Sequence, residues 1–112
     1  MSLKTTPTLP EPLEEYFAAA NAHDADRVAA CFAEDAFVRD EGHDIGGRDA
    51  IRAWADETGR KYRYRADVVS IDEAADRATV TARLAGEFPG SPIELQFRFK
   101  LFGRRIAGLE IG

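Results

Sequence analysis

Apolar residues occupy every second position from residue 93 to residue 101, and this alternation constrains the fold more than any other feature of the sequence. The apolar residues are Ile93, Leu95, Phe97, Phe99 and Leu101, and the residues between them are Glu94, Gln96, Arg98 and Lys100. Side chains of a β-strand point alternately to the two faces of a sheet, so the pattern predicts a strand with one apolar and one polar face. Because an apolar sheet face has to be covered by another layer, the rest of the chain is expected to supply that cover.

The first part of the chain has apolar residues at helical spacing, and we expect its helices to form the covering layer. Four apolar residues follow Pro12 at i, i+3, i+4 and i+7: Leu13, Tyr16, Phe17 and Ala20. Proline suits the first turn of a helix, so we predict an amphipathic helix that ends near residues 21–23, with Tyr16 on its inner face. Asp24 suits the N-cap of a second short helix, in which three residues repeat the spacing: Val28, Cys31 and Phe32.

The middle of the chain is predicted to change from strand to loop and back to helix. Residues 36–40, Ala-Phe-Val-Arg-Asp, suit a short strand, and residues 41–47, with three glycines, suit a loop. A third helix is predicted after Gly47, with Gly59 just past its end. Four residues share one face of this helix: Ile51, Trp54, Ala55 and Thr58.

Four antiparallel strands are predicted in the remainder, the third of them the alternating one. Aromatic and β-branched residues favour a strand over residues 62–71, and alternation favours another over residues 77–88, with a turn at residues 72–76. Pro89-Gly90-Ser91-Pro92 connects the second strand to the third, and Gly103 permits a turn before a last strand at residues 106–111. Helices followed by strands predict an α+β fold. A strongly curved sheet would form a cone, whose open end is a natural position for a small-molecule pocket.

Length, charge and cysteine content limit the function. A chain of 112 residues has the size of one domain, and its net charge of −5 has the wrong sign for binding nucleic acid or an anionic membrane. No apolar run is long enough to span a bilayer, and the one cysteine, Cys31, is interpreted as a small buried residue. We therefore expect a cytoplasmic protein that needs no cofactor and has neither nucleic acid nor membrane as a partner.

Three segments share a pattern with a known family. They are Tyr-Phe-Ala-Ala-Ala-Asn-Ala-His-Asp from Tyr16, Cys-Phe-Ala-Glu-Asp-Ala-Phe-Val-Arg-Asp from Cys31, and Gly-Arg-Asp-Ala-Ile-Arg-Ala-Trp from Gly47. In these segments the chain resembles the nuclear transport factor 2-like superfamily, and more narrowly ketosteroid isomerases and the polyketide cyclase-like (SnoaL-like) branch. The resemblance implies a cone-shaped, cystatin-like α+β roll with three N-terminal helices packed on a curved, mostly antiparallel sheet. Residues 11–112 would form this one domain, after a flexible lead at residues 1–10.

The resemblance also implies catalytic roles for two residues. Tyr16 matches the first-helix tyrosine that donates a hydrogen bond to the substrate oxyanion in ketosteroid isomerases, and Asp40 matches the aspartate that moves the proton. A protonated aspartate completes the oxyanion hole in that family, and Leu95 stands at its position here. Leucine donates no hydrogen bond, and the loss of one such donor lowers a rate by on the order of 10²-fold. We therefore do not expect efficient steroid isomerisation.

Other residues near Asp40 are candidates because of their chemistry. His43 could supply the missing donor or act with Asp40 as an acid–base pair, although histidines in loops are usually solvated. The acidic residues around His43 could also be read as a metal site, but their spacing matches no recognised motif, so no metal site is predicted. The expected pocket wall consists of Trp54, Leu95, Phe97 and Phe99, although tryptophan at helical spacing is more often part of a core.

Two functions remain open at this point. The first is a cofactor-independent isomerase, cyclase or dehydratase that acts on a small, mostly apolar carbonyl compound, with Asp40 as general base. The second is a non-catalytic dimeric ligand-binding or adaptor module, which the apolar Leu95 favours. In either case we expect a homodimer formed through the outer sheet face, where the predicted strands carry four cationic residues: Arg63, Arg65, Arg98 and Lys100.

Overall fold

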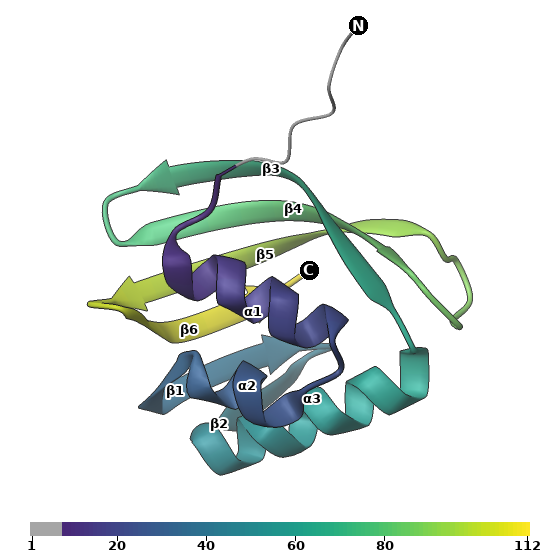
Figure 1. Ribbon diagram of the computed structural model, residues 1–112, viewed down its shortest axis with the longest axis horizontal. Coiled ribbons are helices and arrows are strands. Elements are labelled where there is room, and N and C mark those ends of the chain that lie inside the picture. The colour runs from purple at the N-terminus through teal and green to yellow at the C-terminus, as the bar shows by residue number, and fades with distance from the viewer. Residues whose placement is uncertain (1–7) are drawn as a thin grey trace, which may run out of the picture.

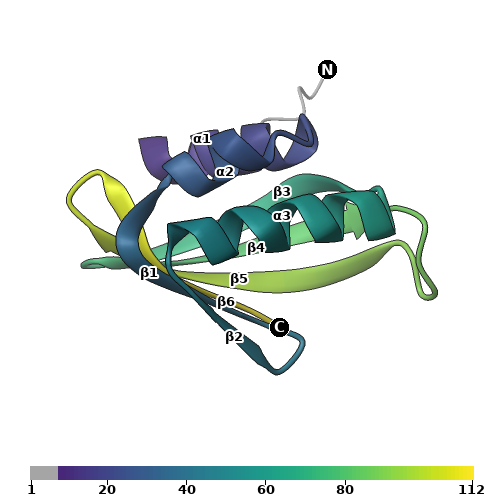
Figure 2. The same ribbon diagram turned by 90° about the horizontal axis from the view of Figure 1, so that it is seen from below.

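Three helices cover one face of a curved six-stranded sheet in the computed structural model, which describes residues 8–112 (Figures 1 and 2). The elements are α1 (Glu11–Asn21), α2 (Ala25–Ala30), β1 (Phe32–Asp40), β2 (His43–Gly46), α3 (Arg48–Tyr62), β3 (Arg65–Ala74), β4 (Arg77–Ala85), β5 (Ile93–Phe102) and β6 (Arg105–Ile111). The predicted α+β fold is confirmed. Most of the predicted flexible lead, residues 1–7, lies outside the described residues.

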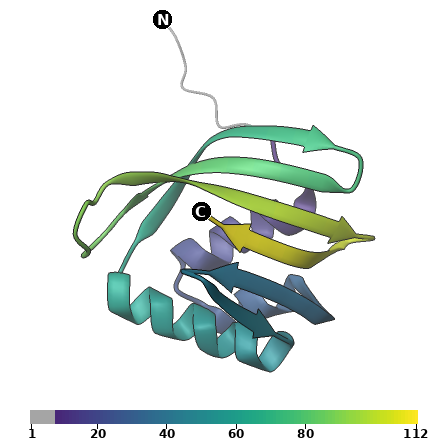
Figure 3. The ribbon, with the colours of Figure 1, turned by 180° about the vertical axis from the view of Figure 1, so that it is seen from behind.

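The sheet has the strand order β2-β1-β6-β5-β4-β3, seen from its other side in Figure 3. Every neighbouring pair is antiparallel except β1 and β6, which are parallel. The prediction of a mostly antiparallel sheet is therefore confirmed. The parallel pair places the end of β1 beside the end of β6, because Arg39 pairs with Glu110 in the register.

The middle of the alternating strand behaves as its sequence predicts, although Ile93 at its start is exposed. On β5, Phe97 and Phe99 are buried, whereas Arg98 and Lys100 are exposed. The helix residues at the predicted spacing, Leu13, Tyr16, Phe17 and Ala20, are all buried on the inner side of α1. The core of the protein therefore lies between α1 and the inner face of the sheet.

The second helix is shorter and the first strand longer than the sequence suggests. α2 ends at Ala30, and Phe32 begins β1 instead of continuing the helix. The i, i+4 spacing of Val28 and Phe32 is a helical signal, but Phe32 pairs with Ile106 of β6 and is fully buried there. Tertiary pairing has overridden the local pattern at this point.

The predicted loop at residues 41–47 contains an additional strand, β2. Asp40 pairs with His43 across a two-residue turn in which Glu41 has a φ of 52° and Gly42 a φ of 76°. A turn with positive φ at both central residues is the usual closure of a hairpin, but the first of them is normally asparagine, aspartate or glycine. Because glutamate stands at this position, the sequence did not indicate the hairpin.

The third helix runs past its predicted end. Gly59 lies inside α3, where an added Cβ would lie 3.4 Å from Nδ1 of His23, and the helix ends at Tyr62. Arg63 follows in the left-handed conformation, with a φ of 45°, and β3 begins only at Arg65. Arg63 is therefore wrongly predicted as a sheet residue, and Tyr62 belongs to a helix instead of a strand.

The end of α3 is held against the end of β4 by a close backbone approach. A Cβ at Gly86 would lie 2.6 Å from the carbonyl oxygen of Tyr62 and 2.8 Å from Cα of Tyr64. The amide of Glu87 donates a hydrogen bond to the same Tyr62 oxygen at 2.7 Å. Glycine at position 86 thus lets the chain bring two tyrosines to the inner side of the sheet. No helix among the described residues has the length and apolar character needed to cross a membrane.

Candidate functional site

A cavity of about 350 Å³ lies between α3, the ends of β1 and β6, the β4–β5 connection and the inner face of β4 and β5. Its wall is mostly apolar and aromatic, and within residues 8–112 the charged side chains that line it are those of Asp40 and Glu41. The lining residues are Asp40, Glu41, Trp54, Thr58, Tyr62, Tyr64, Leu84, Phe88, Pro89, Ile93, Leu95, Phe97, Ile111 and Gly112. A cavity of this size, with few polar groups in an apolar wall, has the form of a small-molecule site.

Asp40 is the last residue of β1, and its carboxylate forms part of the cavity wall. The indole Nε1 of Trp54 donates a hydrogen bond to Oδ2 of Asp40 at 3.0 Å. Burial raises the pKa of Asp40 above its ordinary value of 3.8, and the hydrogen bond from Trp54 opposes this effect. A carboxylate with a raised pKa is a stronger base than one in water, so Asp40 has the properties of a general base.

Trp54 reaches Asp40 because α3 is anchored at the other end of β1. The guanidinium of Arg48, at the start of α3, donates hydrogen bonds to the carbonyl oxygen of Phe32 at 2.7 and 3.2 Å. Phe32 begins β1 and Asp40 ends it, so helix and strand run alongside each other between these residues. This arrangement holds one carboxylate oxygen of Asp40 in a fixed direction.

Tyr64 is a lining residue that the sequence did not single out. It follows the left-handed residue Arg63 and lies in the same cavity wall as Asp40. Burial raises the pKa of Tyr64 to about 12, with a further contribution from the negative charge of Asp40. Its phenol is therefore protonated at neutral pH and able to donate a hydrogen bond. The only signal in the sequence is the alternation of Tyr62 and Tyr64 with arginines, which equally suits an ordinary strand.

Tyr16 lies deeper in the protein than a residue of the cavity wall. It is 1% exposed, and its ring centroid lies 5.0 Å from that of Phe17 and 5.5 Å from that of Phe99, in edge-to-face contact. Together with Trp54 and Tyr64 it borders a smaller hollow behind the main cavity. Burial raises the pKa of Tyr16 well above its ordinary value, and the negative charge of Asp40 contributes.

The remaining predicted site residues divide into two groups. Trp54, Leu95 and Phe97 line the cavity, whereas Phe99 is buried beside Tyr16 and does not line it. His43 is exposed on β2, opposite Asp40 in the hairpin, and also lies outside the wall. Its positive form would lower the pKa of Asp40. Within residues 8–112, no three His, Cys, Asp or Glu side chains are grouped so that they could hold a metal ion.

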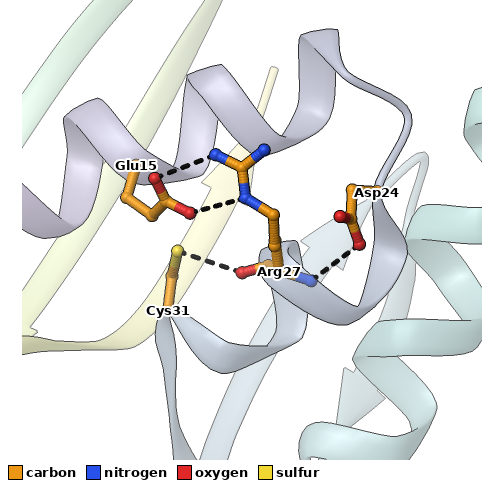
Figure 4. Close-up of polar contacts among 4 residues, drawn as sticks. All are labelled: Glu15, Asp24, Arg27 and Cys31. Carbon is orange, nitrogen blue, oxygen red and sulfur yellow. Dashed lines mark hydrogen bonds and ion pairs between the residues drawn. The ribbon is translucent and has the colours of Figure 1, made fainter.

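Cys31 follows the last residue of α2 and does not line the cavity, and Figure 4 shows its contact with Arg27. Its thiol donates a hydrogen bond to the carbonyl oxygen of Arg27 at 3.3 Å, and the guanidinium of Arg27 is held by both carboxylate oxygens of Glu15. Burial raises the pKa of the thiol to about 11. Because the thiolate is the reactive form, this cysteine is a poor nucleophile.

Iodoacetamide is therefore expected to alkylate Cys31 slowly in the folded protein. A rise of the pKa from 9.0 to about 11 lowers the thiolate fraction at mildly alkaline pH, by about 100-fold relative to an unperturbed thiol. Mass spectrometry of timed samples measures the rate, and the same protein in guanidinium chloride gives the rate of the exposed thiol. Equal rates in the folded and unfolded protein would contradict the burial argument.

Comparison with known structures gives the same architecture. The chain is 38% identical to a candidate polyketide cyclase from Sinorhizobium meliloti, with a TM-score of 0.90 over 93% of this chain and 95% of that one. It is 21% identical to a protein with a ketosteroid isomerase-like fold from Catenulispora acidiphila, solved in complex with trimethylamine, with a TM-score of 0.84 over 94% of this chain and 86% of that one. A cystatin-fold protein from Novosphingobium aromaticivorans is 16% identical, with a TM-score of 0.76 over 91% of this chain and 95% of that one. No curated protein matches the sequence.

The family assignment rests on most of the chain. The model of the SnoaL-like domain matches residues 13–108, a span that runs from α1 into β6 and includes Tyr16, Asp40, Trp54 and Leu95. The structural neighbours carry the same cone-like fold. The chain has this fold and a half-buried carboxylate in an apolar cavity. Because the family model matches most of its length, the chain belongs to the SnoaL-like domain family, within the nuclear transport factor 2-like superfamily.

Proposed function

We propose that this protein binds a small carbonyl compound in the cavity and moves a proton at the carbon next to the carbonyl group, with Asp40 as general base and no cofactor. The observation that carries the proposal is the Asp40 carboxylate, half-buried in an apolar wall and held by Trp54 at 3.0 Å. Isomerases and cyclases of this kind begin with the same step, in which a base removes a proton made acidic by a carbonyl group.

The proton transfer requires a hydrogen-bond donor for the oxygen of the enolate. Asp40 takes the proton from carbon, the electron pair of the C–H bond moves into the new C=C bond, and negative charge develops on the carbonyl oxygen. Tyr64 supports this role because its protonated phenol belongs to the same wall as Asp40. Tyr16 is the alternative donor, one layer deeper, and His43 is the candidate acid partner across the hairpin.

A non-catalytic binding module is the second candidate function. The observation that favours it is Leu95, an apolar residue in the cavity wall at the position where the resemblance to ketosteroid isomerases implies a donor. The similar protein from Catenulispora acidiphila holds trimethylamine, a ligand without a carbonyl group. On this view the cavity binds its ligand and releases it unchanged.

Deuterium exchange separates the two functions. A panel of small apolar ketones is incubated with the protein in deuterium oxide, and NMR follows both the binding of each ketone and the loss of its α-protons. Proton transfer predicts exchange faster than in a blank that contains buffer alone. Binding without exchange, for every ketone that binds, would overturn the catalytic proposal and leave the binding module.

The two candidate donors are compared with matched variants that each remove one hydroxyl. Tyr64→Phe is expected to lower the exchange rate by about 10²-fold, the usual effect of losing one oxyanion donor. Tyr16→Phe is expected to change it by less than about tenfold, because Tyr16 borders the smaller hollow and is not a lining residue of the cavity, and a hydroxyl that does not touch the ligand makes no direct contact with the transition state. The opposite order of effects would assign the donor role to Tyr16.

We propose the outer sheet face as the surface of a homodimer. Phe37 of β1 is 49% exposed there, beside a row of opposite charges formed by Asp44, Arg39, Glu110 and Arg98 on adjacent strands. A row of this kind can pair with a second copy of itself around a two-fold axis. Light scattering after size-exclusion chromatography is expected to give a dimer for the wild type and a monomer for Arg98→Glu. An unchanged mass of that variant would argue against this surface.

A further inference from the structure

We infer that the ligand of the cavity carries a positively charged amine or quaternary ammonium group in addition to its carbonyl group. This inference rests on the proposed function and adds the chemical class of the compound. In the part of the chain that the structure describes, none of the lining residues is lysine, arginine or histidine, while two of them, Asp40 and Glu41, carry carboxylates. Asp40 is half-buried and Glu41 is exposed, so the charge of Asp40 acts in the less polar surroundings, and both charges favour a cation over a neutral ligand of the same shape.

Aromatic rings supply the rest of a cation site. The cavity is lined by Trp54, Tyr62 and Tyr64 from α3 and the residues after it, by Phe88 from the β4–β5 connection and by Phe97 from β5. The faces of such rings attract ammonium groups, and a group of rings around one cavity is the usual means of binding a quaternary ammonium ion. An apolar carbonyl compound without charge would use the rings but gain nothing from the carboxylates.

Glu41 is held at the cavity by a hydrogen bond to one of these rings. The hydroxyl of Tyr62 donates to Oε1 of Glu41 at 2.8 Å, so the carboxylate and the ring are fixed together in the wall. Glu41 is also the residue that adopts a φ of 52° in the β1–β2 turn, where glycine or asparagine would be less strained. A strained residue that contributes a charge to a cavity points to a role in binding.

One cation of the chain already lies against the same ring. Nζ of Lys61 lies 5.1 Å from the centroid of the Tyr62 ring, and Tyr62 and Glu41 both raise the pKa of Lys61. Lys61 is exposed and does not line the cavity. This exposed contact is consistent with a Tyr62 ring and a Glu41 carboxylate that attract an ammonium group. The reacting end of the ligand would lie at Asp40 and Tyr64, and its cationic end at Glu41 and Tyr62.

The test compares two ketones that differ only in charge. One is a methyl ketone that carries a trimethylammonium group, and the other is the neutral ketone in which tert-butyl replaces it. Isothermal titration calorimetry on the wild-type protein is expected to give at least about tenfold tighter binding of the cationic ketone, which corresponds to one or two cation–π and ion-pair contacts. This preference is expected to fall as salt is added.

Matched variants locate the preference within the cavity. Glu41→Gln is expected to reduce the ratio of the two affinities to less than about threefold, because it removes a charge that attracts only the cationic ketone. Glu94→Gln removes the same charge from an exposed position of β5 outside the wall, and it is expected to keep the wild-type ratio. Equal affinity for the two ketones, no binding of the cationic ketone, or an equal loss in both variants would each overturn the inference.

The proposed function is judged separately, by exchange instead of by binding. If the cationic ketone binds more tightly and neither ketone exchanges its α-protons, the ligand class stands and proton transfer fails. If both ketones exchange and bind equally well, proton transfer stands and the ligand class fails. The two measurements use the same protein and the same two ketones, so each result is assigned without ambiguity.

Discussion

Asp40→Asn is expected to lower the rate of deuterium exchange by about 10² to 10⁴-fold, the usual contribution of a general base. Asparagine has nearly the same shape, and its side-chain oxygen can still accept the hydrogen bond from Trp54 that Asp40 accepts at 3.0 Å. The variant therefore removes the base while keeping the wall of the cavity. NMR measures the exchange rate of the ketone that the wild type exchanges fastest, under the same conditions for both proteins.

The pH dependence of the wild-type rate gives a second measurement on the same residue. Exchange needs the charged form of Asp40, so the rate is expected to rise with pH as this group loses its proton. Because burial raises the pKa of Asp40, the midpoint is expected above 3.8. A pH-independent rate, or an Asp40→Asn variant with the activity of the wild type, would rule out Asp40 as the base.

The same substitution is expected to stabilise the fold at neutral pH. An acid whose pKa is raised in the folded state binds its proton more tightly there than in the unfolded chain, so stability falls as pH rises from 3.8 through the folded pKa. Above that window Asp40 is charged and half-buried, and this cost is absent in Asp40→Asn. Thermal unfolding is expected to give a higher Tm for the variant at pH 7, with the difference shrinking as pH falls to 3.8. A lower Tm at pH 7 would contradict the burial argument.

Tyr16→Ala is expected to lower the free energy of unfolding by about 3 to 5 kcal/mol, as for other large aromatic residues cut back to alanine in a core. Tyr16 is 1% exposed, and its ring makes edge-to-face contacts with Phe17, Phe32 and Phe99 at centroid distances of 5.0, 6.0 and 5.5 Å. Removal of the ring leaves a cavity among side chains that cannot fully collapse. Since a small domain is stable by only about 5 to 15 kcal/mol, this loss is a large part of the total stability, and the variant is expected to unfold at a lower temperature than the wild type.

Tyr16→Phe is the matched control for this loss. It keeps the ring and its contacts and removes only the hydroxyl, so the free energy of unfolding is expected to change by less than about 1.5 kcal/mol. Urea unfolding followed by tryptophan fluorescence measures both variants, since the single tryptophan, Trp54, lies beside Tyr16 in the smaller hollow. A loss as large as that of Tyr16→Ala would mean that the hydroxyl, and not the packing of the ring, holds this part of the core.

Features that depend on one element alone were predictable from the sequence. Strict alternation identified β5, because only a strand separates Phe97 and Phe99 from Arg98 and Lys100. Helical spacing identified α1 and the inward position of Tyr16. Among the site residues, Asp40 was predicted through the resemblance to a family, and Trp54, Leu95 and Phe97 were predicted as pocket wall. The structure brings all four to one cavity.

Features that depend on contacts between distant segments were not predictable. Whether Phe32 ends a helix or begins a strand depends on its partner Ile106, and whether residues 43–46 form a loop or a strand depends on the hairpin with β1. Gly59 indicated the end of the third helix, and Tyr62 was predicted to lie in a strand. The structure continues α3 to Tyr62, where Gly86 allows the two backbone segments to approach closely. In each case the local sequence pattern was weak, and the tertiary contact determined the secondary structure.

The sequence by itself determined that the chain forms an apolar-faced sheet covered by helices, because periodicity follows directly from the geometry of each element. The sequence also indicated that an acidic residue, Asp40, lies at the end of a strand. Only the tertiary structure decided that Asp40 shares a cavity with Tyr64 and Glu41 while Tyr16 lies behind it. The reason is physical: the character of the cavity depends on which side chains the curved sheet and α3 bring together, and these come from segments far apart in the sequence, between positions 40 and 112.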